Sequence, residues 1–193
     1  MFKKFLMVGF ILIANIYFVY AKAEAITLAC LPSEGTMEEK ERVSYISAIE
    51  GAFIKVGNNV ADRQRLEKLI KEMEIQDSSD TNEATAKAGK LMKVDYLVAV
   101  IIDNWHEKVL DTRAMEQDRK NDTMKPKENY YRTFEKVRIT LKIIEVETSM
   151  IIAQGNVEDY RYYNYRRDTQ GKLAKKVVDK VMKDAKKQLK KKR

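Results

Sequence analysis

The sequence has few of the residues from which catalytic and metal centres are built. Its 193 residues include one cysteine, Cys30, and one histidine, His106. A single cysteine excludes an internal disulfide, and one cysteine with one histidine excludes a zinc site made of Cys and His ligands. There is also no glycine-rich phosphate loop, no nucleophile elbow and no paired-histidine motif. We therefore expect no enzymatic activity, no cofactor and no bound metal.

Proline and glycine are scarce as well, with two and seven residues respectively. These numbers exclude collagen-like chains and proline-rich linkers. Hydrophobic residues make up 45% of the chain and charged residues 34%, which is the balance of a globular protein rather than a disordered one. The length suits one domain, or one domain with tails.

The first residues have the layout of a secretory signal peptide. Two lysines precede an apolar run from Phe5 to Tyr20, and Ala21-Lys22-Ala23 places small residues where signal peptidase reads the chain. We predict that residues 1–23 are removed by cleavage after Ala23 and that the protein lies in the periplasm or at the periphery of the outer membrane. Two alternatives remain open, an uncleaved N-terminal anchor and a lipoprotein acylated on Cys30. Lipidation on Cys30 would remove residues 26–29, which we expect to form a strand.

The positive charge of the chain is concentrated at its C-terminus. The formal net charge is +8, and the signal peptide contributes three lysines and no acid. Lys180–Arg193 contains eight basic residues and one acid, so the remaining body, residues 24–179, has a net charge of −2. We expect the basic tail, residues 185–193, to extend the last helix, either as a solvated end or as a binder of anionic membrane or another polyanion. The residues of this predicted surface are Lys186, Lys187, Lys190, Lys191, Lys192 and Arg193.

Apolar periodicity predicts one α/β domain over residues 24–184, in which a mixed β-sheet is flanked by helices. Strands are expected at 26–31, around Val60, at 94–102, at 134–146 and from Met150 to about Tyr165. Helices are expected from a Thr36 N-cap to about 55, from an Asp62 cap through Met73, around 84–92, and from about Thr169. Residues 108–129 carry charges of both signs and few large apolar side chains, so they are predicted to form an exposed loop.

The strand predicted at 134–146 has a distinct alternation. Val137, Ile139, Leu141 and Ile143 alternate with polar residues, which predicts one buried face and one face in contact with water or a partner. The apolar positions then change parity through Ile144 and beyond, which indicates a β-bulge.

Four segments together resemble a bacterial envelope family, and one of them, Ile26–Leu31, lies where the first strand of that family is expected. Val60–Glu72 is similar to its pattern of a strand, Asp-Arg and a helix ending in Glu, and Ala88–Val98 to its Gly-Lys and Ala-Asp-Tyr strand signature. Ile139–Ile152 resembles its hairpin with valine, an acid and threonine, although Ser149 stands where the family usually has glycine. The family, with its CsgG/LpoB-like domain, holds the curli-secretion channel subunit and the outer-membrane lipoprotein activator of penicillin-binding proteins.

The resemblance covers most of residues 26–184, and it implies an adaptor in the periplasm rather than a pore. The hairpins of a membrane-spanning channel would alternate between apolar and polar residues with aromatic rims, and Lys108–Asn129 does not. The segment from Tyr160 to Tyr165 alternates in part but is too polar to build a barrel.

The segment with the strongest indication of binding is Tyr160–Arg167, at the end of the second predicted hairpin strand. Its tyrosines and arginines have the composition of a protein-interface hot spot. A sheet-edge strand with half-buried tyrosines is the plain alternative, and a platform for single-stranded nucleic acid is disfavoured by the export signal. The predicted partner-binding residues are Tyr160, Tyr162, Tyr163, Tyr165, Arg161, Arg166 and Arg167.

Two further groups of residues could carry chemistry. Asp103, His106 and Glu107 could bind a metal or act as acid and base, but nothing else in the sequence supports them, so we expect a lone histidine in solvent. Asp62-Arg63 could bind an anion at a helix N-terminus, but a cap with an ion pair explains the same residues.

We therefore predict a non-enzymatic exported adaptor that binds another protein of the bacterial envelope. Three alternatives stay open: a membrane-associated lipoprotein, a self-assembling secretion-accessory subunit, and a basic-tail binder of anionic membrane or polyanion. Homo-oligomers are compatible with the sequence, and no nucleic-acid partner is expected.

The signal-peptide prediction can be tested by the intact mass of the exported protein. We expect a mass that begins at Glu24, because the small residues before it form the cleavage site. A mass that begins at an acylated Cys30 would contradict both the cleavage site and the first predicted strand.

Overall fold

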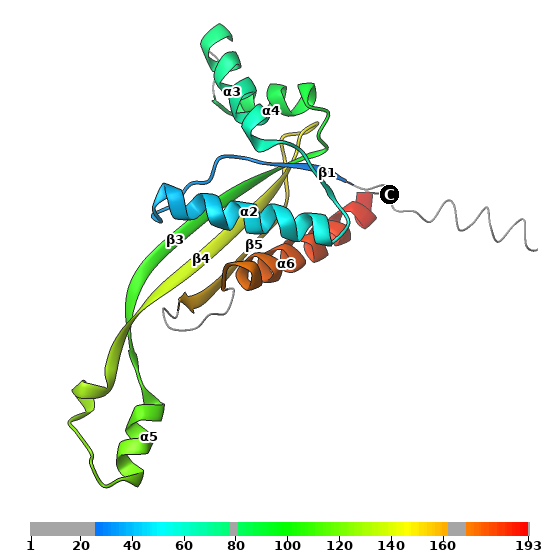
Figure 1. The fold of residues 1–193 in the computed structure, drawn as a ribbon. Coiled ribbons are helices and arrows are strands. Elements are labelled where there is room, and N and C mark those ends of the chain that lie inside the picture. The colour runs from blue at the N-terminus through cyan, green and yellow to red at the C-terminus, as the bar shows by residue number, and fades with distance from the viewer. Residues whose placement is uncertain (1–25, 78–80, 162–168, 193) are drawn as a thin grey trace, which may run out of the picture.

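A five-stranded mixed sheet forms the centre of the molecule, as the sequence predicted (Figure 1). The computed structural model describes residues 26–77, 81–161 and 169–192, so the predicted signal peptide lies outside the described residues. The sheet order is β2-β1-β3-β4-β5; β1 runs parallel to β2 and β3, whereas β3, β4 and β5 are antiparallel. The strands are β1 (Thr27–Cys30), β2 (Asn59–Val60), β3 (Tyr96–Leu110), β4 (Tyr131–Glu145) and β5 (Ile151–Arg161).

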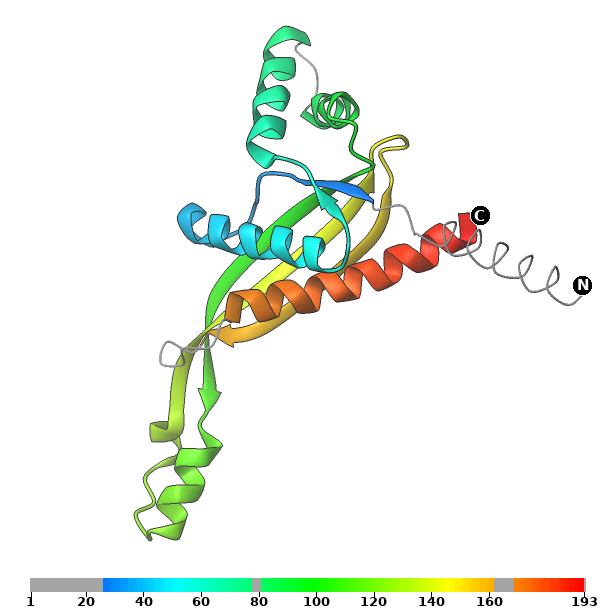
Figure 2. The same ribbon diagram turned by 45° about the vertical axis from the view of Figure 1, so that its right-hand side comes forward.

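Two pairs of helices flank this sheet (Figures 1 and 2). The long helices α2 (Glu39–Lys55) and α6 (Thr169–Lys192) lie side by side across one face of the sheet. The second pair, α3 (Arg63–Asp77) and α4 (Thr81–Leu91), packs on the other face at one end. No helix within the described ranges is long and apolar enough to cross a membrane.

The main core lies between the sheet and the α2–α6 pair. The alternation in β4 places Val137, Ile139, Leu141 and Ile143 there, each no more than 1% exposed. At Gly155 the α6 helix approaches β5 so closely that a Cβ atom would lie 2.9 Å from the Val181 side chain. Close packing of this kind excludes water and fixes which side of each strand faces the helices.

A smaller core lies under α3 and α4. The β4–β5 register shifts between Ile143 and Ile144, which confirms the bulge that the parity change indicated. Beyond the bulge, Val146 packs with Leu97, Leu66 and Ala88. Because the side chains change sides of the sheet at the bulge, the end of the β4–β5 hairpin contributes to the core on the opposite face.

The segment before α2 differs from the prediction. Thr36 does not cap the helix; α2 begins at Glu39, after Glu38, without a side-chain cap. Instead, the Thr36 hydroxyl accepts a hydrogen bond from the Asn104 backbone N–H at 3.0 Å, and the Thr36 N–H donates to the Asp103 carboxylate at 3.1 Å. The segment is tied to β3 because Gly35, at φ +119°, lies directly against the backbone of Ile102, where no Cβ atom fits.

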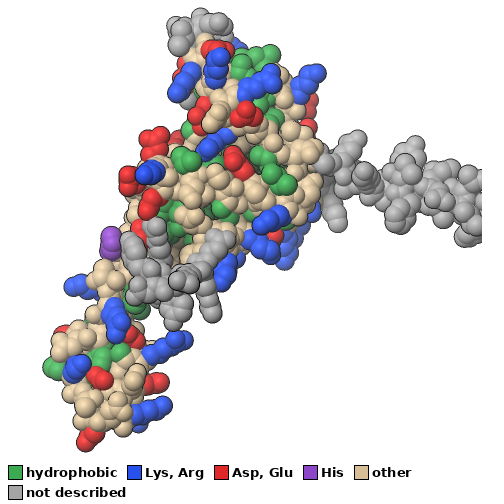
Figure 3. All heavy atoms as spheres, in the orientation of Figure 1, with side chains coloured by type: hydrophobic (Ala, Val, Ile, Leu, Met, Phe, Trp, Pro, Cys, Tyr) green, Lys and Arg blue, Asp and Glu red, His purple; other side chains and the backbone are tan. Residues whose placement is uncertain are grey.

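The prediction of an exposed loop over residues 108–129 is wrong in its secondary structure. β3 continues to Leu110, and the segment then forms helix α5 (Thr112–Lys120) and the short 3₁₀ helix η1 (Lys127–Tyr130). The paired ends of β3 and β4 project beyond the body as a two-stranded arm with α5 and η1 at its tip (Figure 2). No helix of the body covers the arm, so charged residues of both signs coat its sides (Figure 3). The sequence therefore has little apolar periodicity there from which the strands could be predicted.

One tyrosine organises the tip of the arm. Tyr130 is 3% exposed, its hydroxyl donates to Asp118 at 3.0 Å, and the same hydroxyl accepts from the Lys125 N–H at 2.9 Å. Asp111 accepts a hydrogen bond from the Ala114 N–H and so caps α5. These contacts make the tip a defined structure at the end of the arm.

The single cysteine lies inside the main core. Cys30 is fully buried in β1, between β2 and β3, and burial raises the pKa of its thiol to about 12, with the negative charge of Glu50 adding to the effect. A chain that began at Cys30 would lose residues 27–29, which form the rest of β1. Cleavage before Cys30 is therefore incompatible with an intact β1.

We predict that Ser149→Gly stabilises the protein. Ser149 adopts φ 57° in the β4–β5 turn, a left-handed conformation that costs a side-chain-bearing residue about 1–2 kcal/mol. The greater freedom of glycine in the unfolded chain offsets part of this gain, so we expect the free energy of unfolding to rise by about 0.5–1 kcal/mol.

Urea unfolding monitored by circular dichroism measures this change. The matched control is Ser47→Gly within α2, where helix propensity predicts a loss of about 0.5 kcal/mol. Equal losses in both variants would show that the turn conformation is not strained.

Candidate partner-binding face

The side of the sheet that faces away from α2 and α6 forms a broad polar and aromatic surface. Residues opposite one another on antiparallel strands share a face. The β3–β4 and β4–β5 registers therefore align three neighbouring side chains in each row, except in the last row, where Glu107 and Phe134 form a pair. Among the described residues, only α3 and α4 cover part of this side, at one end. We call the remainder the open face; its residues are Ala99, Ile101, Asp103, Trp105, Glu107, Phe134, Lys136, Arg138, Thr140, Lys142, Gln154, Asn156, Glu158 and Tyr160.

One row of the open face places a lysine between two aromatic rings. Trp105 on β3, Lys136 on β4 and Tyr160 on β5 are directly opposite one another. The Lys136 Nζ lies 5.6 Å from the Trp105 ring centroid and 5.3 Å from that of Tyr160. Each such cation–π contact contributes on the order of 0.5–1 kcal/mol at exposed sites. The row therefore holds both rings beside a fixed positive charge.

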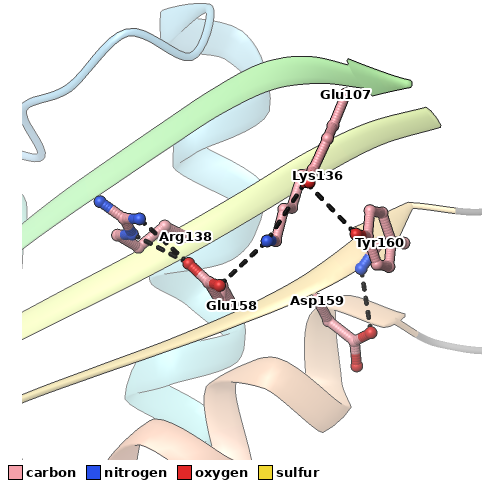
Figure 4. Close-up of polar contacts among 6 residues, drawn as sticks. All are labelled: Glu107, Lys136, Arg138, Glu158, Asp159 and Tyr160. Carbon is pink, nitrogen blue, oxygen red and sulfur yellow. Dashed lines mark hydrogen bonds and ion pairs between the residues drawn. The ribbon is translucent and has the colours of Figure 1, made fainter. Parts of the chain in front are cut away.

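The neighbouring row adds an arginine on the same tryptophan. The Arg138 guanidinium lies 4.9 Å from the Trp105 centroid, and its Nε and a terminal nitrogen donate to one Glu158 oxygen at 3.2 and 3.0 Å. The other Glu158 oxygen pairs with the Lys136 Nζ at 3.0 Å. Glu158 thus bridges the two cations that contact Trp105 (Figure 4).

A second carboxylate completes the network on the arm side. Glu107 accepts from the Tyr160 hydroxyl at 3.3 Å and pairs with the Lys136 Nζ at the same distance. The Phe134 ring meets the Tyr160 ring edge to face, with centroids 6.0 Å apart. Lys136 therefore lies between two carboxylates as well as two rings, and its side chain is only 18% exposed.

This network moves two pKa values in opposite directions. The hydrogen bond to Glu158, followed by the contact with Glu107, raises the pKa of Lys136 above its ordinary value. The hydrogen bond from Lys136, followed by that from Arg138, lowers the pKa of Glu158. A depressed carboxyl pKa stabilises the fold above the ordinary carboxyl range, and this contribution is lost as the pH falls through the folded-state pKa. Both shifts favour the charged forms of Lys136 and Glu158 near neutral pH.

The open face continues into a groove at its other end. This groove has a volume of about 690 Å³ and lies between the sheet, α3–α4, the segment 31–34 and the first half of α2. It shares Ala99, Ile101 and Lys142 with the open face and adds Arg63 and Glu67 from α3. A ligand that extended along the sheet could therefore contact both regions.

The predicted partner-binding residues are only partly placed. Tyr160 lies on the open face and Arg161 ends β5, whereas Tyr162, Tyr163, Tyr165, Arg166 and Arg167 lie outside the described residues. In the basic tail, α6 runs as far as Lys192, with Lys186 and Lys187 exposed. Arg193 lies outside the described residues.

The two other candidate groups have structural roles. Asp103 and Glu107 share the open face, whereas His106 has the opposite parity in β3, so the three side chains do not converge. Within the described ranges, no group of three His, Cys, Asp or Glu residues could hold a metal ion. Asp62 accepts from the Gln64 N–H and thereby caps α3, while Arg63 pairs with Glu50 at 3.8 Å, which agrees with the cap and ion-pair interpretation.

Sequence reasoning missed the principal residues of the open face. Trp105, Lys136, Arg138 and Glu158 come from three strands and meet only through the sheet register. The one available signal was the polar residues at alternate positions of β4, which predicted a face in contact with water or a partner. It could not identify which residues of β3 and β5 lie opposite.

Neither protein-family models nor curated proteins match this sequence. Solved structures do match. PelC, a dodecamer from Paraburkholderia phytofirmans, is 12% identical, with 86% of this chain and 90% of that chain covered at a TM-score of 0.47. Lipoprotein GNA1162 from Neisseria meningitidis is 9% identical, with coverages of 82% and 99% and a TM-score of 0.49. The LpoB C-terminal domain from Escherichia coli is 11% identical, with coverages of 71% and 84% and a TM-score of 0.43.

The matching structures therefore include bacterial lipoproteins and an LpoB domain. Their identities and scores are too low to assign this chain to a family or to transfer a function to it. The resemblance read from the sequence motifs remains a prediction.

The charge network can be tested by the titration of Glu158. In Lys136→Gln, we expect the Glu158 carboxyl pKa to rise toward its ordinary value, because the hydrogen bond from Lys136 is the largest cause of its depression. Carbon-detected NMR of the glutamate side chains measures this pKa directly. Arg138→Gln should raise the same pKa by less, and a larger effect of Arg138→Gln would contradict the geometry.

Proposed function

We propose that this protein is a non-enzymatic adaptor of the bacterial envelope that binds another envelope protein on its open face. The observation that carries the proposal is the cluster of Trp105, Tyr160 and Arg138 on an otherwise polar sheet surface. Tryptophan, tyrosine and arginine are the residue types most enriched among interface hot spots. Their gathering from three strands onto one surface supports a binding role.

The rigidity of the cluster also supports binding. Lys136 is held by two carboxylates and two rings, and Arg138 is held by Glu158 and Trp105. Side chains that are already ordered lose little conformational entropy when a partner binds, which leaves more of the contact energy for affinity. Since the positive and negative charges compensate each other locally, the cluster suits a partner surface that is mainly apolar at its centre and polar at its rim.

An adaptor fits the chemistry of the described residues better than an enzyme. Cys30, the only thiol, is fully buried, and its raised pKa keeps it protonated. The pKa shifts on the open face strengthen the charged forms of Lys136 and Glu158, whereas an acid or base catalyst needs a pKa near the working pH. The export signal and the family resemblance read from the sequence place the expected partner in the envelope.

Site-specific photo-crosslinking in cells tests the adaptor role. A photoreactive residue at Asn156, on the open face, is expected to capture one envelope protein, whereas the same residue at Lys175, on the exposed side of α6, should not. Trp105→Ala and Arg138→Ala should each reduce capture at Asn156 by tenfold or more, because hot-spot truncations cost about 2 kcal/mol.

Trp105 also provides a direct readout with the purified partner. It is the only tryptophan of the chain, so its emission should shift to shorter wavelength when a partner covers the open face. Capture of only further copies of this protein would favour the self-assembling subunit instead. Equal capture at Asn156 and Lys175 would contradict the open face as the binding site.

A further inference from the structure

The C-terminal half of α6 carries positive charge that acidic residues within the described ranges only partly neutralise. Its last described core residues are Val181, Met182 and Ala185, which pack against the sheet. On the outer side of this half, Lys183 and Lys186 are exposed and make no ion pair with any residue in the described ranges, whereas Lys187 pairs with Asp184 at 3.6 Å. Lysine side chains gather along this edge of the body (Figure 3).

Exposed apolar side chains lie at the start of β5, near Lys187. Met150 and Ile151, where the β4–β5 turn enters β5, are 63% and 53% exposed. A shallow hollow of about 720 Å³ joins the start of β5 to α6, with Ile151 on one side and Asp184 and Lys187 on the other. This end of the molecule therefore presents both apolar and cationic side chains to its surroundings.

The same end of the molecule receives the N-terminal segment. β1 begins there, close to the C-terminal end of α6 (Figures 1 and 2). The predicted export run lies before Ile26, outside the described residues.

From the exposed lysines and the exposed apolar side chains we propose that this end of the protein docks on the surface of an anionic phospholipid bilayer. Lys183, Lys186 and Lys187 bind the lipid headgroups, and Met150 and Ile151 insert among the headgroups and the first acyl carbons. Basic residues near an anionic membrane contribute about 1 kcal/mol each, and apolar anchors add the burial of their methylenes. This membrane-docking end is distinct from the open face, so it does not depend on the adaptor function.

Vesicle sedimentation with the exported protein tests the proposal. The protein should bind vesicles that contain about a third phosphatidylglycerol in phosphatidylcholine, and it should bind pure phosphatidylcholine weakly. Affinity should fall steeply between 50 mM and 500 mM salt, because the headgroup attraction is screened.

Two variants distinguish the contribution of the lysines to membrane binding from that of the exposed apolar side chains. The triple variant Lys183→Gln, Lys186→Gln and Lys187→Gln should lose on the order of 100-fold in partition coefficient, since each lysine contributes about a factor of five. The double variant Met150→Ser and Ile151→Ser should lose about tenfold or more. All of these side chains are exposed, and circular dichroism verifies that each variant remains folded.

The matched control changes the same number of lysines at the other end of α6. Lys172→Gln, Lys175→Gln and Lys176→Gln lie about 10 Å or more from Lys183 along α6, which is a Debye length at about 0.1 M salt, so at that salt they should leave partition within twofold. Equal losses in the two triple variants would overturn the proposal and leave only a general effect of net charge. Binding to soluble inorganic polyphosphate as tight as binding to the vesicles, and unaffected by the Met150 and Ile151 changes, would replace the bilayer with a polyanion.

Discussion

The long antiparallel pairing of β3 with β4 is the constraint on which the rest of the structure depends. Fifteen consecutive residue pairs join the two strands, from Tyr96–Glu145 to Leu110–Tyr131. At one end this ladder is covered by helices on both faces and forms the two cores; at the other it leaves the body and becomes the arm. Because a one-residue slip would exchange the buried and open sides of both strands, the register also determines the composition of the open face.

Both surfaces to which we assign roles follow from how this sheet is covered. α2 and α6 bury one face, and α3 with α4 bury only one end of the other, which leaves Trp105 and its neighbours accessible. Near the C-terminal end of α6, beyond its last core residue Ala185 and just before it, Lys183, Lys186 and Lys187 are exposed. The open face and the membrane-docking end lie on different parts of the molecule, which would allow the protein to bind a partner while resting on a membrane.

Much of the fold could be predicted from the sequence where the periodicity was strong. The β4 alternation, the bulge near Ile144 and the buried first strand with Cys30 were all predicted, and the structure confirms them. Two predictions failed for identifiable reasons. Thr36 looked like a helix cap, but the close approach of Gly35 to β3 turns its hydroxyl toward Asn104. Residues 108–129 looked like a loop because an arm without covering helices needs no apolar stripe.

The sequence by itself determined the export signal pattern, the α/β class and the concentration of lysines at the C-terminus. These features depend on local composition and on side-chain periods of 2.0 and 3.6 residues, which are visible in the sequence alone. Only the tertiary structure decided that Trp105, Lys136, Glu158 and Tyr160 form one network. These residues are as much as 55 positions apart in the chain, and only the hydrogen-bonded register of three strands brings their side chains into contact.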